Sequence, residues 1–124
     1  METRTLPVIE KVIEQDQLAR YADVSGDHNL LHLDPDFAAG TQFCGIIAHG
    51  MLTLAFISEM MTSAFGASWL ESGRLKVRFK GAAYPGDILR TWGQVVKDKP
   101  NDGYRTLECS VGLKNGRGED LIGG

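Results

Sequence analysis

The stretch His49-Gly-Met-Leu-Thr-Leu-Ala-Phe-Ile-Ser-Glu-Met-Met-Thr-Ser-Ala-Phe65 decides the fold of this chain, because it is apolar around most of its circumference. Its apolar residues are too numerous for one narrow stripe at helical spacing, and a helix of this kind is buried on most of its sides. Gly66 follows and is a suitable residue to end a helix. The pattern therefore predicts one central helix that the rest of the chain encloses.

The chain beyond this helix changes from helical to strand-like periodicity. Arg74–Lys80 alternates basic and apolar residues, so that Leu75, Val77 and Phe79 share one side of an extended chain. This pattern predicts an amphipathic strand whose basic side chains face away from the core.

Two longer strands are predicted further on, over residues 87–97 and 104–114. Between them lies Pro100-Asn-Asp-Gly103, a turn-forming sequence that favours an antiparallel hairpin. Asn115-Gly116 predicts a second turn, after which residues 119–122 form a short last strand. Together these segments indicate an antiparallel sheet.

The chain before the central helix combines one strand with short helices. The mixture of β-branched and polar residues over 4–13 predicts a first strand, whose start Pro7 confines to an edge. A helix is predicted to begin at Asp16 and to end at Gly26, which suits a left-handed residue after a helix. A second short helix is predicted over 34–39, with an aspartate that can cap it and a proline in its first turn.

This order of elements predicts an α+β fold in which an antiparallel sheet wraps around one central apolar helix. The arrangement is called the hotdog fold. With 124 residues and 43% hydrophobic content the chain supplies one core, so residues 1–124 are expected to form a single domain. A domain of this size rarely encloses a deep pocket alone, and a homodimer or higher homo-oligomer is therefore expected.

Composition argues against several classes of protein. The net charge of −3 provides no broad basic field for nucleic acid or an anionic membrane. The chain has no run of about 18 apolar residues, and its N-terminal residues lack the apolar region of a signal peptide, so a cytoplasmic protein is expected. Cys44 and Cys109 belong to no CxxC pair, which argues against a disulfide framework or a structural zinc site.

All three histidines lie in two short pieces, 21–35 and 47–52. Asp27 and His32 are five residues apart, a separation that directs them differently from any regular helix or strand. Irregular backbone is therefore expected between them, and Asn29 is a residue that turns favour. A convergent Asp/His pair on a fixed loop can hold one water molecule for proton transfer.

His49-Gly50 stands where the central helix should begin. The first backbone N–H groups of a helix are unpaired and carry a partial positive charge, so a carbonyl oxygen can bind there. The N–H of Gly50 is the candidate donor to a developing enolate or oxyanion, because glycine lets a ligand approach the backbone closely. His49 is expected to hold, through its ring, the loop that presents Gly50.

Two segments, Ser25-Gly-Asp-His-Asn-Leu-Leu-His-Leu-Asp-Pro35 and Ala48-His-Gly-Met-Leu52, resemble the hydratase motif of MaoC-like (R)-specific enoyl-CoA hydratases and (R)-3-hydroxyacyl-thioester dehydratases. The resemblance spans nearly the whole chain and is strongest over 21–58, with a weaker match at Phe79 and Pro85-Gly-Asp87. It implies a hotdog fold and reversible syn hydration of a trans-2-enoyl thioester. The thioester would be carried by coenzyme A or an acyl-carrier protein, with no cofactor and no metal.

The resemblance also implies a role for each matching residue. Asp27 and His32 would grip the catalytic water and exchange its protons. Gly50 would bind the thioester carbonyl through its N–H. Ser58 would help to orient the Asp27 side of the site, and Asn29 would support the loop.

Other interpretations of the same residues stay open. Asp27 and His32 also suit a helix cap and a histidine packed in a loop. His28 and His32, four residues apart, suggest a metal site when a carboxylate such as Asp27 lies nearby. Pro35 argues against the regular helix that such a metal site would need.

Other functions stay open as well. A hotdog thioesterase would use a carboxylate and the helix N-terminus to hydrolyse the same thioester. A non-catalytic subunit of a heterodimeric dehydratase, or a carrier-protein adaptor, would bind the thioester without needing both Asp27 and His32. The cations at positions 74, 76, 78 and 80 form a one-sided row that can meet the phosphates of the carrier, although such a row is more often only solvated.

Overall fold

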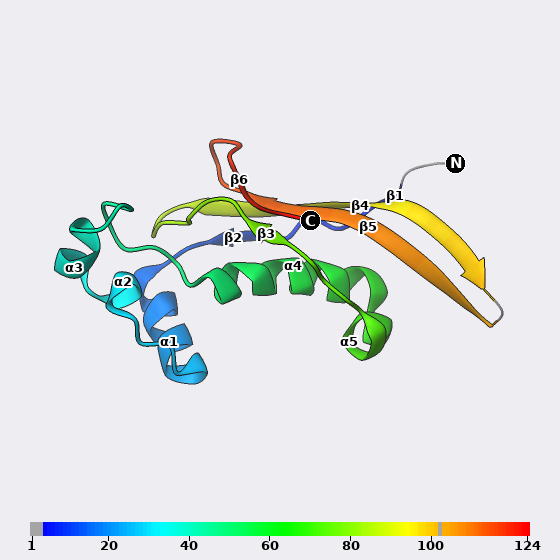
Figure 1. Ribbon diagram of the computed structural model, residues 1–124, viewed down its shortest axis with the longest axis horizontal. Helices are drawn as coiled ribbons and strands as arrows, with labels where there is room; N and C mark the ends of the chain where they lie inside the picture. Colours follow the sequence, from blue (N-terminus) through cyan, green and yellow to red (C-terminus); the bar gives the residue numbers. More distant parts are fainter. Residues whose placement is uncertain (1–3, 102) are drawn as a thin grey trace.

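A long helix packed along one face of an antiparallel sheet organises the molecule (Figure 1). The structure, a computed structural model, describes residues 4–101 and 103–124. The helix α4 (Gly50–Phe65) buries five side chains, those of Thr53, Phe56, Ile57, Met60 and Met61. One stripe at four-residue spacing is exposed: Met51, Ala55, Glu59 and Ser63. The predicted central helix, buried on most of its sides, is confirmed, and this stripe is its open side.

The sheet has the strand order β1-β4-β5-β6-β3, with β2 also paired to β4. β1 (Arg4–Thr5) and β2 (Glu10–Val12) lie along the same edge of β4 (Ile88–Asn101). The prediction of one continuous strand over 4–13 is therefore wrong, because two short strands occupy this segment. Pro7 has no N–H to donate, and the N–H of Ile9 donates to the hydroxyl of Thr91 at 2.8 Å instead of to a strand carbonyl.

The hairpin of β4 and β5 (Tyr104–Lys114) is the longest pairing and reaches Asn101 opposite Tyr104. β4 continues beyond the predicted end at residue 97, because Pro100 is accommodated next to the turn. Gly103 has φ +79°, as the predicted turn requires, while Asp102 lies outside the described residues. The turn predicted at Asn115 leads into β6 (Asp120–Gly123), which pairs with β5.

The strand predicted over 74–80 is shorter than expected. β3 includes only Arg78–Phe79 and pairs with β6 at the end of the sheet order. Leu75 and Val77 are half-buried and pack against the core as predicted, whereas Phe79, predicted on the same side, is 49% exposed. Its pairing with β6 joins Arg78 to Gly123 and Phe79 to Ile122.

The short helices that precede α4 in the chain lie together at one end of the sheet, and the short helix that follows α4 lies at the opposite end (Figure 1). α1 (Gln15–Ser25) ends at Gly26 with φ +81°, and the carboxylate of Asp34 caps α3 (Pro35–Ala39), both as predicted. Two other helices are not predicted by the sequence patterns used above. They are α2 (Leu30–Leu33) and α5 (Ala67–Ser72), which follows α4 after Gly66.

The core lies between α4 and the sheet. Its most deeply buried large side chains include Leu18, Ile57, Met60, Leu89, Leu113 and Ile122. Burial of a side chain of this size contributes roughly 1.5–3 kcal/mol, so this layer holds helix and sheet together. The α+β architecture with its central helix confirms the predicted hotdog fold.

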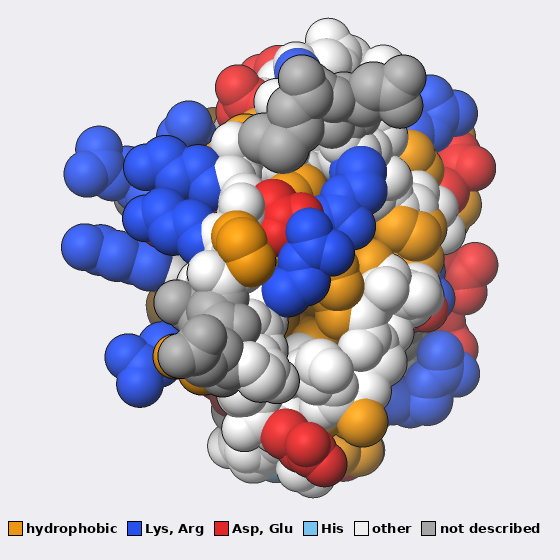
Figure 2. Space-filling view, turned by 90° about the vertical axis from the view of Figure 1, so that its right-hand side faces the viewer, with side chains coloured by type: hydrophobic (Ala, Val, Ile, Leu, Met, Phe, Trp, Pro, Cys, Tyr) orange, Lys and Arg blue, Asp and Glu red, His pale blue; other side chains and the backbone are white. Residues whose placement is uncertain are grey.

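The surface of the molecule is charged, with both signs interleaved at the end shown in Figure 2. Asp98 of β4, for example, accepts hydrogen bonds from Arg4 at 3.2 Å and from Arg105 at 2.6 Å. Within the described residues, no helix is both long and apolar enough to cross a membrane.

Candidate active site

Asp27 follows α1 directly, on a turn that the preceding glycine makes possible. The N–H of Gly26 donates to the carbonyl of Ala22 at 2.9 Å, and the N–H of Asp27 donates to the hydroxyl of Ser25 at 3.2 Å. One carboxylate oxygen of Asp27 accepts the N–H of Asn29 at 3.2 Å. This bond orients the carboxylate and leaves its second oxygen for another partner.

His32 lies in the short helix α2, whereas the sequence predicts irregular backbone between Asp27 and His32. Asn29 accounts for the difference, because its side-chain oxygen accepts the N–H of Leu31 at 2.9 Å and so caps the turn. The helix begins at Leu30 and does not include His28. The predicted geometry for a metal site on a regular helix is therefore absent here.

The ring of His32 is held by a backbone carbonyl. Its Nδ1 lies 2.7 Å from the carbonyl oxygen of Ile47, and the side chain is 8% exposed. Since a carbonyl oxygen only accepts hydrogen bonds, Nδ1 carries the proton, and in the neutral ring Nε2 has a free lone pair. His32 thus presents a proton acceptor whose direction the Ile47 bond fixes.

His49 is the residue before α4 and is buried, with 1% exposure. Its Nε2 donates to the backbone carbonyl of Asp27 at 3.0 Å, and its ring stacks on that of His32 with centroids 3.9 Å apart. The ring of Tyr21 meets the His49 ring edge-on, with ring centroids 4.7 Å apart. Burial lowers the pKa of His49, which the hydrogen bond to Asp27 opposes, and the neighbouring His32 lowers it further. His49 therefore supports the pair as a neutral ring.

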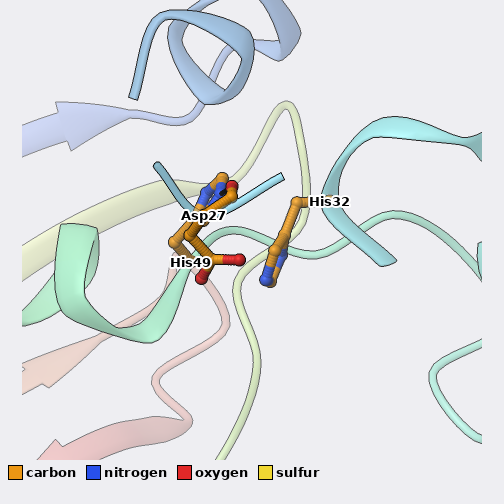
Figure 3. A group of neighbouring side chains, drawn as sticks. All are labelled: Asp27, His32 and His49. Atoms are coloured by element: carbon orange, nitrogen blue, oxygen red, sulfur yellow. Dashed lines mark hydrogen bonds between the residues drawn. The ribbon is translucent and has the colours of Figure 1, made fainter. Parts of the chain in front are cut away.

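Asp27, His32 and His49 form one cluster, in which one carboxylate oxygen and one nitrogen from each ring all lie within 4.8 Å of one another. Figure 3 shows the three side chains together, with the Asp27 carboxylate beside the His32 ring. A water molecule can bridge two polar atoms this far apart, since each hydrogen bond spans about 2.7–3.0 Å. The sequence predicts this meeting of Asp27 and His32.

The same cluster is poorly arranged for a metal ion. An ion binds in the plane of each imidazole at about 2.0–2.1 Å from the nitrogen. The rings of His32 and His49 are stacked with centroids 3.9 Å apart and planes only 26° apart, so an ion in the plane of one ring lies well out of the plane of the other. One ion cannot lie close to both nitrogens and in both ring planes. His28, the other candidate ligand, bonds instead to the exposed carboxylate of Asp23 at 3.1 Å.

Gly50 is the first residue of α4 and lines an open pocket of about 370 Å³ together with His32. The walls also include Phe79 and Lys80 of the β3 segment. A Cβ atom at position 50 would lie 3.3 Å from the ring of Phe79, so glycine allows this ring to pack directly on the helix start. The N–H of a first helical residue has no partner within its helix, and it is thus available to a ligand in the pocket.

Ser58 is not brought to this cluster. It lies eight residues beyond Gly50 in α4, about 12 Å along the helix axis at 1.5 Å per residue. Its hydroxyl accepts the indole N–H of Trp69 at 3.0 Å and so connects α4 with α5. This hydrogen bond gives Ser58 a packing contact, and its role beside Asp27 stays a prediction.

Sequence reasoning did not find every residue that shapes the site. The carbonyl of Ile47, which sets the His32 tautomer, has no sequence signal, because every residue has a carbonyl. The sequence places Phe79 and Lys80 on a strand and Lys80 in a row of cations, but their place in the pocket wall depends on how the chain at β3 passes the start of α4. Tyr21 stands in the same short segment as Asp27 and His32, which was the available signal for its contact with His49.

Comparison with known proteins identifies the family to which the sequence is similar. Residues 2–115 match the family described as the MaoC like domain. Over 88 residues the chain is 32% identical to 3-hydroxyacyl-thioester dehydratase Z of Mycobacterium tuberculosis, covering 68% of this chain and 58% of that protein. It is 27% identical over 116 residues to 3-hydroxybutyryl-CoA dehydratase of Methylorubrum extorquens, covering 91% of this chain and 72% of that protein.

A solved structure shares the fold. The (R)-hydratase from A. caviae involved in PHA biosynthesis superposes with a TM-score of 0.81, covering 99% of this chain and 92% of that one. Sequence identity is 24%, so this likeness concerns the architecture. The chain spans only 58% of the length of dehydratase Z.

Proposed function

Because this chain belongs to the MaoC-like dehydratase family, we propose that it catalyses the reversible hydration of trans-2-enoyl thioesters to (R)-3-hydroxyacyl thioesters. The observation that carries the proposal is the juxtaposition of Asp27 and His32 beside the start of α4. The pair supplies groups that accept and donate protons, and Gly50 supplies a backbone donor.

In the proposed reaction, the pair holds one water molecule between the Asp27 carboxylate and the Nε2 of His32. One of the two groups takes a proton from the water as its oxygen bonds to C3 of the enoyl group. A proton is returned to C2 from the same face, which gives syn addition and restores the starting protonation of the pair. Proton transfer by positioned groups of this kind contributes about 10²–10⁴-fold to the rate.

The N–H of Gly50 would stabilise the charge that develops during this addition. As the water adds to C3, electron density moves to the thioester carbonyl oxygen, which then resembles an enolate oxygen. A backbone N–H with no partner in its helix, at the positive end of the α4 dipole, is well suited to bind this oxygen. The thioester itself makes C2 more acidic, which assists the proton transfer at this carbon. Addition of water involves no net oxidation or reduction, so the reaction needs no redox cofactor.

The site lies open in one copy of the chain. Asp27 is exposed, and the pocket that His32 and Gly50 line is also open to solvent. A substrate with an acyl chain and a large carrier needs more cover than this pocket provides. The proposal therefore includes a homodimer or higher homo-oligomer in which a second copy covers the site.

Two alternatives are tested by the same experiment. A thioesterase would release free thiol, and a binding-only subunit would do neither reaction. We would add the purified protein to crotonyl-CoA, follow the enoyl absorbance in the ultraviolet, and follow free thiol in the same cuvette. Loss of the enoyl absorbance without thiol is the expected result. Thiol release, or no change of either signal at high protein concentration, would overturn the proposed hydratase.

A further inference from the structure

Four basic residues along the β3 segment form what we call the cation row: Arg74, Lys76, Arg78 and Lys80. All four are exposed, while Leu75 and Val77 between them are half-buried. The row is therefore one-sided, with its charges toward solvent. An extended chain rises about 3.3 Å per residue, so the row spans about 20 Å.

The cation row differs from the other basic side chains in its lack of partners. The chain has 13 Lys and Arg residues, and eight of those outside the row form ion pairs with carboxylates. These eight are Arg4, Lys11, Arg20, Arg90, Lys97, Arg105, Lys114 and Arg117. Lys99 also has an interaction. Among residues 4–101 and 103–124, no carboxylate pairs with the four members of the row.

The row leads directly to the candidate active site. Phe79, between Arg78 and Lys80, packs on the start of α4 so closely that a Cβ atom at Gly50 would lie 3.3 Å from its ring. Phe79 and Lys80 also line the pocket together with His32. A ligand whose carbonyl binds at Gly50 would therefore have the cation row next to any part of it that leaves the pocket along β3.

We infer that the cation row binds the phosphate groups of a coenzyme A carrier, and this inference rests on the proposed function. The pantetheine arm of coenzyme A separates the thioester from a diphosphate and a ribose 3′-phosphate. These phosphates lie well away from the reacting carbons, and an unpaired row of cations about 20 Å long matches an extended string of negative charges. Arginine and lysine are the side chains that phosphate groups prefer.

A carrier protein fits these observations less well. It would bring an acidic surface much wider than the row, which is a single line of alternate residues along one segment. The chain has a net charge of −3, so the rest of its surface would repel an acidic protein. Coenzyme A, by contrast, is small enough for its phosphate groups to contact the cation row alone.

The test compares substrates with and without the phosphates. We would measure kcat and KM for crotonyl-CoA, crotonyl-pantetheine and a crotonyl-carrier protein, using the full chain and a row variant with Arg74→Gln, Lys76→Gln and Arg78→Gln. Lys80 stays unchanged, because it also lines the pocket. The matched control neutralises three cations elsewhere: Arg90→Gln, Lys97→Gln and Lys114→Gln. Both variants lose the same charge, so a long-range effect of net charge would appear in both.

For the row variant, we expect the KM for crotonyl-CoA to rise roughly ten- to thirtyfold with little change in kcat, because exposed charge pairs each contribute modestly to binding. Its KM for crotonyl-pantetheine should equal that of the unmodified chain, which also shows that the variant is folded. In the control variant both values should stay within about twofold.

Other results are equally decisive. An unchanged KM for crotonyl-CoA in the row variant would overturn the inference while leaving the proposed hydratase intact. Loss confined to a crotonyl-carrier-protein substrate would overturn it in favour of a protein carrier. If the unmodified chain hydrates neither small thioester, the proposed function itself fails, and equilibrium binding of free coenzyme A to the two variants then tests the row on its own.

Discussion

The imidazole rings of His32 and His49 are stacked, with centroids 3.9 Å apart and ring planes 26° apart. Each ring donates one N–H to a backbone carbonyl, that of His32 to Ile47 and that of His49 to Asp27. The stack therefore joins the start of α4 to the loop that carries Asp27. Proton-transfer groups and the Gly50 donor are thus fixed relative to each other by one buried unit.

The lowered pKa of His49 predicts a dependence of stability on pH. In the folded chain His49 resists protonation, whereas the unfolded chain takes up a proton near pH 6.5, the ordinary pKa of histidine. Below this value the unfolded state binds more protons, so the free energy of unfolding should fall as the pH decreases from about 6.5. Above it His49 is neutral in both states and has no effect.

Urea unfolding between about pH 5 and 8 measures this slope. His49→Gln has no titrating group at this position, and its amide can still donate to the carbonyl of Asp27. We expect the variant to show a smaller decrease in stability on the acid side. An equal slope in both proteins would mean that another group causes the acid sensitivity.

The N–H of Gly50 can be removed with little change of backbone. Proline is tolerated at the first position of a helix, and His49 before it has φ −60° and ψ 132°, a conformation that suits the residue before proline. Gly50→Pro should lower kcat by about 10²–10³-fold, the effect of losing one oxyanion donor.

Gly50→Ala is the matched control, because it adds a Cβ beside Phe79 but keeps the N–H. It should retain most of the kcat and raise KM. Steady-state kinetics on crotonyl-CoA separates the two variants. Equal losses of kcat in both would show that space at Phe79 matters and that the N–H does not.

Ser58 tests the difference between the family resemblance and the contacts in this chain. Its hydroxyl accepts the indole N–H of Trp69, so Ser58→Ala should lose roughly 0.5–1.5 kcal/mol of unfolding free energy, with kcat unchanged. Trp69→Phe should cause a similar loss, and the double variant should lose less than the sum. A large fall in kcat for Ser58→Ala alone would instead place Ser58 in the reaction.

The sheet offers a test of packing on its outer side. Gly112 stands opposite Trp92 in the β4–β5 pairing, and the indole ring occupies the space that a Cβ at position 112 would need. Gly112→Ala should therefore destabilise the chain by roughly 1–3 kcal/mol in urea unfolding. Gly116→Ala is the control, since its Cβ would meet only the carbonyl of Ile88 at 3.8 Å. Similar losses in both would contradict this packing argument.

The sequence predicts helix ends and caps correctly where the residues that form them are close together in the chain. Gly26 ends α1 and Asp34 caps α3 as expected, because the turn and the cap are made within a few residues. Which residues of 74–80 pair as β3 depends on their partners in β6, some 40 residues later, and no pattern inside 74–80 contains that information. The extent of a strand therefore depends on its pairing partners in the sheet as well as on its own periodicity.

The same distinction applies to the site. Asp27 and His32 were predicted to converge, and the structure brings them together. The tautomer of His32 depends on the carbonyl of Ile47, 15 residues away, and the stack on His49 depends on how α4 packs against α2. Chemistry-bearing residue types can be recognised in sequence, but the groups that orient them are set by tertiary contacts.

The most direct test of the central claim is the rate of crotonyl-CoA hydration by Asp27→Asn and His32→Gln, measured beside the unmodified chain. Both substitutions nearly preserve size, and circular dichroism would show that both variants are folded. If Asp27 and His32 exchange the protons of a shared water, each variant should lose about 10²–10⁴-fold in kcat, and the double variant should lose little more than either. Rates within about threefold of the unmodified chain in both variants would contradict the account, because the reaction would then not depend on this pair.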